Sequence, residues 1–232
     1  MIRVQRIASK LREVNAGIFD IRQQHCRQTP GKGIFPIISS NRLGRPTVRF
    51  RSCAGQSYGL RPFHRFLGVS SNRPLERGDV IIAESTPAYD GQFGQICRSA
   101  SVGAPSDVLS EKYKLLVRAM AAGIEKVRPG VTVSEVACAV DAVLIDAGYE
   151  EKYNHPPYMN RRSHGMGAGS IAPGDIAVEN PTILEEDMVF VVHPNQYLPE
   201  TGYLLCGEPV RVTATGYESL SRKWAELGVV GA

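Results

Sequence analysis

Cysteine pairs at disulfide or metal-binding spacing are missing from this chain of 232 residues. It has five cysteines, an odd number, and no two of them form a Cys-x-x-Cys motif. An odd and scattered set argues against a complete disulfide framework, and without close pairs a zinc knuckle is not supported. The cysteine pattern therefore predicts a protein of the reducing cytoplasm.

Long hydrophobic runs are also missing, since the longest apolar stretches, such as 188–192, have only the length of a strand. We therefore expect no membrane-spanning segment. Acidic residues are scarce in the first 77 positions, where three of them accompany fifteen lysines and arginines. This basic half lacks interleaved aromatic residues and any groove-reading motif, so nucleic acid is not an expected partner.

The first 46 residues are predicted to form an N-terminal extension made of a helix and a loop, and residues 47–232 to form one domain. Apolar residues at helical spacing predict the helix at 2–15, and clustered Pro and Gly predict the loop after it. Alternating or continuous apolar runs predict strands in the domain. The predicted strands are 47–53, 79–84 and 92–102.

Two helices are predicted after these strands. The first runs from Ser106 to about Val127 and is stopped by Pro129-Gly130. The second has a capping box, Thr132-x-x-Glu135, in which each side chain bonds the other's backbone amide, and it ends at a glycine. Strands followed by helices and then by more strands indicate an α+β fold with helices packed on an antiparallel sheet.

Three segments of the C-terminal third each place a side chain able to bind a proton or a metal beside a turn or on an apolar strand. A buried ionisable group in such a place is costly unless it is paired or bound to a metal. The order and spacing of the segments resemble the pita-bread family of methionine aminopeptidase, prolidase, aminopeptidase P and the metal-independent creatinase. The resemblance covers about residues 50–222 and implies a curved antiparallel sheet covered by helices. The three segments are Ser163-His164-Gly165-Met166-Gly167, Met188–Pro194 and Gly207–Thr213.

The resemblance implies a metal site with an unusual set of ligands. His164 matches the family's ligand His, His193 stands where the family has a ligand Glu, and Glu208 matches the final ligand Glu. Two imidazoles and a carboxylate, with Gln95 as a weak fourth oxygen, suit one Zn, Mn, Fe or Co ion. Glu84 and Gln95 occupy the positions of two family Asp residues. Because a neutral Gln cannot offset the repulsion between two cations, a dinuclear site is not expected.

A metal-free site is the competing hypothesis, because creatinase hydrolyses a C–N bond without a metal. His64 lies approximately where relatives carry a functional His, and its near-neutral pKa suits a proton acceptor oriented by Glu84 and Glu208. The family's second catalytic His falls on Ile171. The hydrogen bond that this His would make is then left to Asp175 or to the backbone of the Gly-rich loop.

Each site residue also has an ordinary structural interpretation. Glu84 can be a charge at the end of a strand that reaches solvent, His164 can cap a turn, and His193 can be a hydrogen-bonded core histidine. Arg161 and Arg162 precede His164 and, at the mouth of a cavity, would favour a substrate that bears a carboxylate. Solvated loop charge is the alternative for this pair.

The resemblance predicts a hydrolase of the creatinase or Xaa-Pro peptidase type that acts on a C–N bond of a small molecule or short peptide. The protein would work as a homodimer, either with one divalent metal ion or without a cofactor. A catalytically inactive pita-bread module that binds a peptide or a small acid is the alternative from a different functional class.

Overall fold

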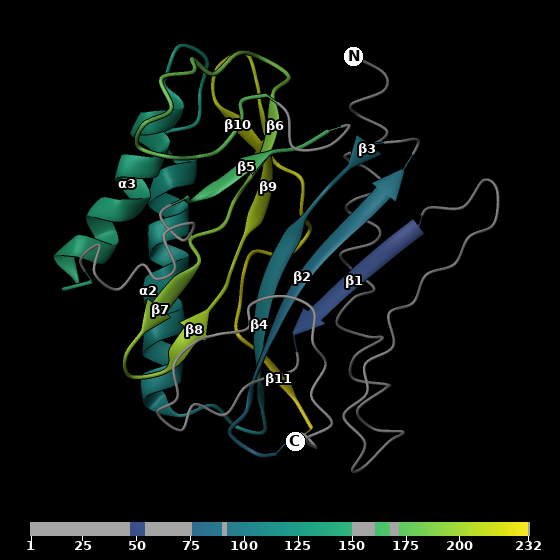
Figure 1. Cartoon of the computed structure of the whole chain (residues 1–232), viewed down its shortest axis with the longest axis vertical. Helices are drawn as coiled ribbons and strands as arrows, with labels where there is room; N and C mark the ends of the chain where they lie inside the picture. Colours follow the sequence, from purple (N-terminus) through teal and green to yellow (C-terminus); the bar gives the residue numbers. More distant parts are fainter. Residues whose placement is uncertain (1–46, 54–75, 90–91, 150–160, 168–171, 232) are drawn as a thin grey trace.

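Figure 1 shows the computed structural model of the chain, in which two helices pack against sheets of short strands. The predicted helix at 2–15 and the loop after it lie outside the described residues. The described residues are 47–53, 76–89, 92–149, 161–167 and 172–231.

The first sheet has the strand order β1-β2-β4-β11, and β3 pairs with the end of β2. β11 runs parallel to β4, and the other pairs are antiparallel. The predicted strand at 47–53 is confirmed. The prediction of one strand at 92–102 was wrong, because pairing stops at Gly94 and Gln95, where Pro87 of β2 has no backbone N–H to donate. The strands are β1 Thr47–Cys53, β2 Val80–Tyr89, β3 Gln92–Phe93, β4 Ile96–Val102 and β11 Gly228–Val230.

The second sheet has the order β10-β9-β6-β5, and all its pairs are antiparallel. A separate hairpin, β7-β8, lies in the chain between β6 and β9. The strands are β5 Ser163–Gly165, β6 Val189–Val192, β7 Gln196–Leu198, β8 Gly202–Leu204, β9 Glu208–Val212 and β10 Tyr217–Ser219.

The helices, α2 Asp107–Ile124 and α3 Val133–Asp146, begin where the sequence predicts. The Ser106 hydroxyl accepts a hydrogen bond from the Leu109 amide at the start of α2. The predicted capping box of Thr132 and Glu135 is confirmed at the start of α3, with both reciprocal bonds present. These caps satisfy amides that have no partner within the helix. Neither described helix has the length and hydrophobicity that crossing a bilayer requires.

The main core lies between the helices and one face of the second sheet. Phe190 and Val192 of β6 and Val210 and Val212 of β9 are fully buried in it together with α2 and α3 residues. In Figure 1 the helices lie on one side of β6 and β9, and β1 and β2 lie on the other. We call the face of the second sheet that points away from the helices the helix-distal face.

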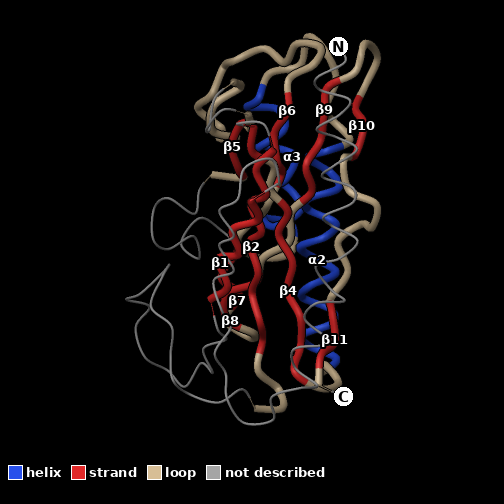
Figure 2. Tube along the Cα trace, turned by 90° about the vertical axis from the view of Figure 1, so that its right-hand side faces the viewer, coloured by secondary structure: helices blue, strands red, loops and turns tan. Residues whose placement is uncertain are grey.

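The two larger sheets meet at a backbone bridge between Cys97 of β4 and Gly207, the residue before β9. Each of these residues donates its amide to the carbonyl oxygen of the other, at 3.2 and 3.0 Å. The bridge makes β4 a neighbour of the start of β9. In Figure 2, β9 lies in the upper part of the molecule and β4 in the lower part, both in front of the helices. Groups on both sheets can therefore contribute to one site at this junction.

Candidate functional site

The structure brings together two of the predicted site residues, His164 and His193. His164 lies in β5 opposite Val191, and His193 directly follows β6. Residues two apart on a strand share a face, so the two imidazoles lie diagonally across from each other on the helix-distal face. Their ring centroids are 5.5 Å apart and their planes meet at 77°. These imidazoles form the centre of the candidate site.

Glu208 points to the opposite face. It pairs with Val192, whose side chain lies toward α2, 3.5 Å from where a Cβ on Gly123 would stand. Glu208 is also in phase along β9 with Val210 and Val212, which pack in the core beneath the helices. The expected convergence of the Glu208 carboxylate with the two imidazoles is therefore not found. Neighbouring residues of a strand alternate between faces, and Glu208 is one residue away from the position that faces the imidazoles.

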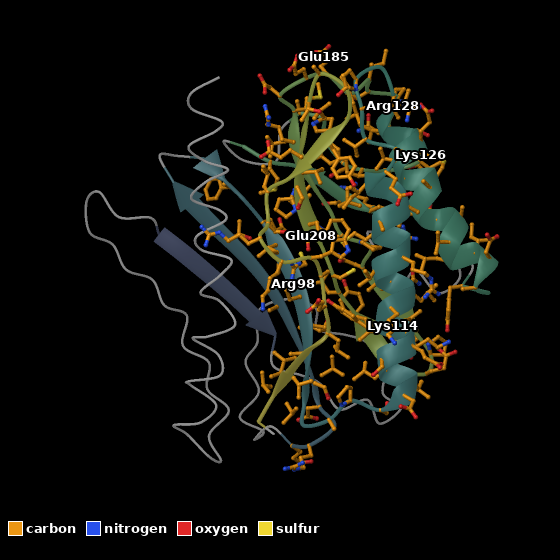
Figure 3. The ribbon with its side chains drawn as sticks, turned by 180° about the vertical axis from the view of Figure 1, so that it is seen from behind. Arg98, Lys114, Lys126, Arg128, Glu185 and Glu208 are labelled. Atoms are coloured by element: carbon orange, nitrogen blue, oxygen red, sulfur yellow. The ribbon has the colours of Figure 1, made fainter. Side chains whose placement is uncertain are left out.

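The Glu208 carboxylate is fully buried and contacts Arg98 and Ser221. Arg98 Nη2 donates to Oε1 at 2.6 Å, and the Ser221 hydroxyl donates to Oε2. Figure 3 labels Arg98 and Glu208, which lie near each other in the interior. Burial raises the pKa of Glu208, although the positive charge of Arg98 and the hydrogen bond from Ser221 act in the opposite direction. Both oxygens of this carboxylate are thus engaged on the side of the sheet that faces the helices.

Gly207, not Glu208, stands opposite His193. A Cβ on Gly207 would lie 2.6 Å from the Cβ of His193 and 3.2 Å from the Sγ of Cys97. His193, Gly207 and Cys97 thus lie in one row across the junction, and the row is so close that a side chain on the central residue would overlap its neighbours. Glycine is required there because of this close approach.

His193 is held as a neutral ring with one nitrogen available. Its Nδ1 lies 3.0 Å from the amide oxygen of Asn195, which can only accept, so Nδ1 carries the proton. Nε2 is buried and has no hydrogen-bond partner among the described residues. Burial, followed by the neighbouring His164, lowers the pKa of His193 to about 4. At neutral pH the lone pair of Nε2 is therefore a buried acceptor on the helix-distal face.

Two further predicted residues, Gln95 and Glu84, lie on the β4 side of this row. Gln95 is buried, and its Nε2 donates to the Sγ of Cys97 at 3.6 Å. Glu84 of β2 is the cross-strand partner of Cys97 and is half-buried. Burial, together with the Glu84 carboxylate, raises the pKa of the Cys97 thiol. The thiol is thus protonated at neutral pH, and a thiolate nucleophile is not expected here.

The residues predicted to bind substrate are engaged with one another or with a helix. Arg161 and Asp175 form an exposed ion pair with a 2.6 Å separation. Arg162 is buried and donates from Nε to Asp141 of α3, so it points toward the helices rather than along the helix-distal face. His64, the predicted proton acceptor, lies outside the described residues.

The metal that the family resemblance implies has no complete set of ligands in the described part of the chain. No group of three or more His, Cys, Asp and Glu side chains that could hold an ion occurs among these residues. The helix-distal face supplies the imidazoles of His164 and His193, while the Gln95 amide bonds to Cys97 on the first sheet and Glu208 bonds to Arg98 on the other face. A bound divalent ion needs at least three well-placed ligands, and the described residues do not fit it.

Sequence reasoning missed the role of Gly207, Cys97 and Asn195. A signal for Gly207 was available, because Cys206, Glu208 and the valines of β9 alternate and therefore share one apolar face. That alternation places the glycine, and not the glutamate, on the other face. The proton on Nδ1 of His193 depends on Asn195, and no pattern in the sequence indicates this contact.

Comparison with known proteins identifies relatives of this fold. The model of metallopeptidase family M24 matches residues 48–216. The probable dipeptidase PepE of Mycobacterium bovis is 30% identical over 188 residues, covering 81% of this chain and 48% of its own length. The Xaa-Pro dipeptidase of Pyrococcus horikoshii is 27% identical over 160 residues, covering 69% of this chain and 44% of its own length.

A solved structure, the Xaa-Pro dipeptidase from Bacillus anthracis, is similar in fold. It superposes with a TM-score of 0.72 at 23% identity, covering 95% of this chain and 62% of the other. This likeness confirms the predicted α+β pita-bread fold. The chain spans about half the length of the curated relatives it matches.

Proposed function

The chain belongs to metallopeptidase family M24, and from that membership we propose that it is a hydrolase of the Xaa-Pro peptidase and creatinase type. Its substrate would be a short peptide or a small amide, cleaved at a C–N bond. The proposal is supported by relatives named as dipeptidases and by the two neighbouring imidazoles of His164 and His193 on the helix-distal face. We further propose that the reaction needs no divalent ion, because the described residues do not form a ligand set for one.

The observation that carries the proposal is the buried lone pair of His193. Its Nε2 has no partner among the described residues, and an unpaired buried acceptor is costly unless a ligand or a water completes it. A substrate N–H or the O–H of an attacking water would supply the missing donor. Because the pKa of His193 is about 4, the ring serves as a neutral acceptor that orients this group.

The proton that the attacking water loses would pass to a group other than His193. His64 remains the predicted proton acceptor, and Glu84 the predicted group that positions an amine or water. Glu84 suits this role because it is half-buried in the same row as Cys97 and carries the negative charge that an ammonium group would require. Glu208 takes no direct part in this scheme, since its oxygens bond to Arg98 and Ser221.

The test is a hydrolysis screen on protein purified without added metal, combined with elemental analysis. Xaa-Pro dipeptides and small amides would be offered with and without a chelator. We expect turnover that the chelator does not change, that is lost in His193→Gln, and that persists in Glu218→Gln, a control in the partly exposed Arg211–Glu218 pair. Stoichiometric metal together with turnover abolished by the chelator would refute the metal-free mechanism.

A second candidate function is a module that binds a ligand without catalysing a reaction. It is favoured by the same lack of a three-ligand group among the described residues. For this candidate we expect no turnover of any substrate but saturable binding of a dipeptide or small acid. Loss of that binding in His193→Gln would locate the ligand on the helix-distal face.

The resemblance also leads us to propose a homodimer in the cytoplasm. Free cysteines at Cys97, Cys138 and Cys206 accord with a reducing compartment. Sedimentation of the purified protein tests the dimer, for which a monomer at all concentrations is the contradicting result.

A further inference from the structure

Beneath the junction of the two larger sheets lies a buried polar network centred on Arg98. Its Nη1 donates to the carbonyl oxygens of Cys97 and Gly207 at 2.8 and 2.7 Å. Its Nη2 donates to Glu208 at 2.6 Å and to the carbonyl oxygen of Lys223 at 2.7 Å. One guanidinium therefore joins β4, the start of β9 and the C-terminal segment.

The two carbonyl oxygens bound by Nη1 belong to the residues of the bridge between the sheets. Cys97 and Gly207 exchange amide hydrogen bonds through the same carbonyls, so each oxygen accepts twice. Arg98 thus sets how closely β4 approaches the start of β9. Its own position is fixed by the Glu208 carboxylate, whose second oxygen accepts from Ser221.

Gly207 links the approach of β4 and β9 to the other face of the sheet, where His193 lies. Its Cα faces His193 so closely that even a methyl group would lie 2.6 Å from the His193 Cβ. A displacement of Gly207 therefore opens or closes the space against which the imidazole packs. The chain of contacts runs from Glu208 through Arg98 and the bridge to His193.

We propose that Glu208 and Arg98 are a positioning pair that holds His193 in register with Gln95 and Cys97 across the junction. This role rests on the proposed function of the helix-distal face, and it replaces the direct catalytic and metal-binding roles expected of Glu208. Glu208 touches neither substrate nor reacting atoms in this arrangement. It acts through Arg98 on the geometry of the imidazole.

The experiment compares Glu208→Gln with Glu218→Gln. The control is matched, because Glu218 also pairs with an arginine of the β9 hairpin, Arg211, at 2.9 Å, in a pair that is only partly buried. The imidazole signals of His193 and the nuclear Overhauser effect between its ring and that of His164 are recorded by NMR, below the unfolding temperature. We expect Glu208→Gln to shift the His193 signals and to lose the ring-to-ring effect, and Glu218→Gln to keep both.

A folded Glu208→Gln protein with wild-type His193 signals and an intact ring-to-ring effect would overturn the proposal, whatever its thermal stability. If Glu208→Gln does not fold, Arg98→Lys serves instead, since it keeps the buried positive charge and removes the guanidinium that donates to both bridge carbonyls. Unchanged ring signals in that variant would equally overturn it. The NMR measurement needs no turnover, so an enzyme without activity would refute the proposed function and leave the positioning role standing.

Discussion

Lowering the pH from 7 to 4 is expected to destabilise the fold through His193. The folded protein holds the pKa of this ring at about 4, against an ordinary value of 6.5, because burial and the neighbouring His164 disfavour the imidazolium. Between these two values the unfolded chain binds more protons than the folded one. The stability that the neutral ring contributes is therefore complete above pH 6.5 and is lost as the pH falls through 4.

The size of this effect follows from the two pKa values. One pKa unit corresponds to about 1.4 kcal/mol, so the difference between 6.5 and about 4 is worth roughly 3 kcal/mol. His193 is only 6% exposed, and solvent screening does not reduce this figure much. A domain is typically stable by about 5 to 15 kcal/mol in total, so the loss would be readily measured.

The assay is urea denaturation of the wild type and of His193→Gln at several pH values between 4 and 7.5. Other titrating groups, among them Glu208 with its raised pKa, are common to both proteins and cancel in the difference. We expect the wild type to lose roughly 3 kcal/mol more than the variant over this range. Parallel stability curves for the two proteins would refute the account of a buried neutral imidazole.

Two further predictions concern packing and buried charge, and denaturation measures both. Gly207→Ala is expected to cost about 1 to 3 kcal/mol through overpacking, whereas Gly216→Ala, with nothing within 4 Å of the new Cβ, should change stability by less than about 0.5 kcal/mol. Equal effects would contradict the close approach at the junction. Arg162→Met should cost about 2 to 4 kcal/mol because it strands a partly buried aspartate of α3, while the exposed Arg161→Met should cost at most about 1 kcal/mol. A larger loss of stability for Arg161→Met than for Arg162→Met would contradict the account in which Arg162 makes the buried ion pair and Arg161 the exposed one.

Local signals in the sequence predicted much of the fold. The capping box at Thr132 was readable because its hydrogen bonds join residues three apart in the chain, and the start of the first helix near Ser106 was also predicted. The strand at 47–53 was readable from its pattern and was confirmed. The interruption between β3 and β4 was missed because it depends on Pro87, which lies on the partner strand.

The candidate site was less predictable because it depends on register between distant strands. His193 and Glu208 are separated by a hairpin, and a register change of one residue decides which face each takes. The family resemblance favoured convergence of these two residues. The alternation of Cys206, Glu208, Val210 and Val212 favoured the opposite face for the glutamate. Burial of the alternating apolar side chains determines the outcome, because exposing that row would cost more than moving one carboxylate.

The buried pair of Arg98 and Glu208 contributes geometry rather than stability. The pKa of Glu208 is raised because burial outweighs the attraction of Arg98. A carboxyl whose pKa is raised in the folded state adds to the free energy of unfolding at low pH. This contribution is complete below the ordinary pKa of 4.5 and is lost as the pH rises through the folded-state pKa. At a pH above that folded value the ionised group therefore costs free energy, as buried ion pairs often do. An apolar replacement for Arg98 would remove a donor from three backbone carbonyl oxygens, and the one of Lys223 has no bridge amide to replace it. The main effect of the pair is thus to align β4 with the start of β9 through these hydrogen bonds. His193 lies on the far side of that junction.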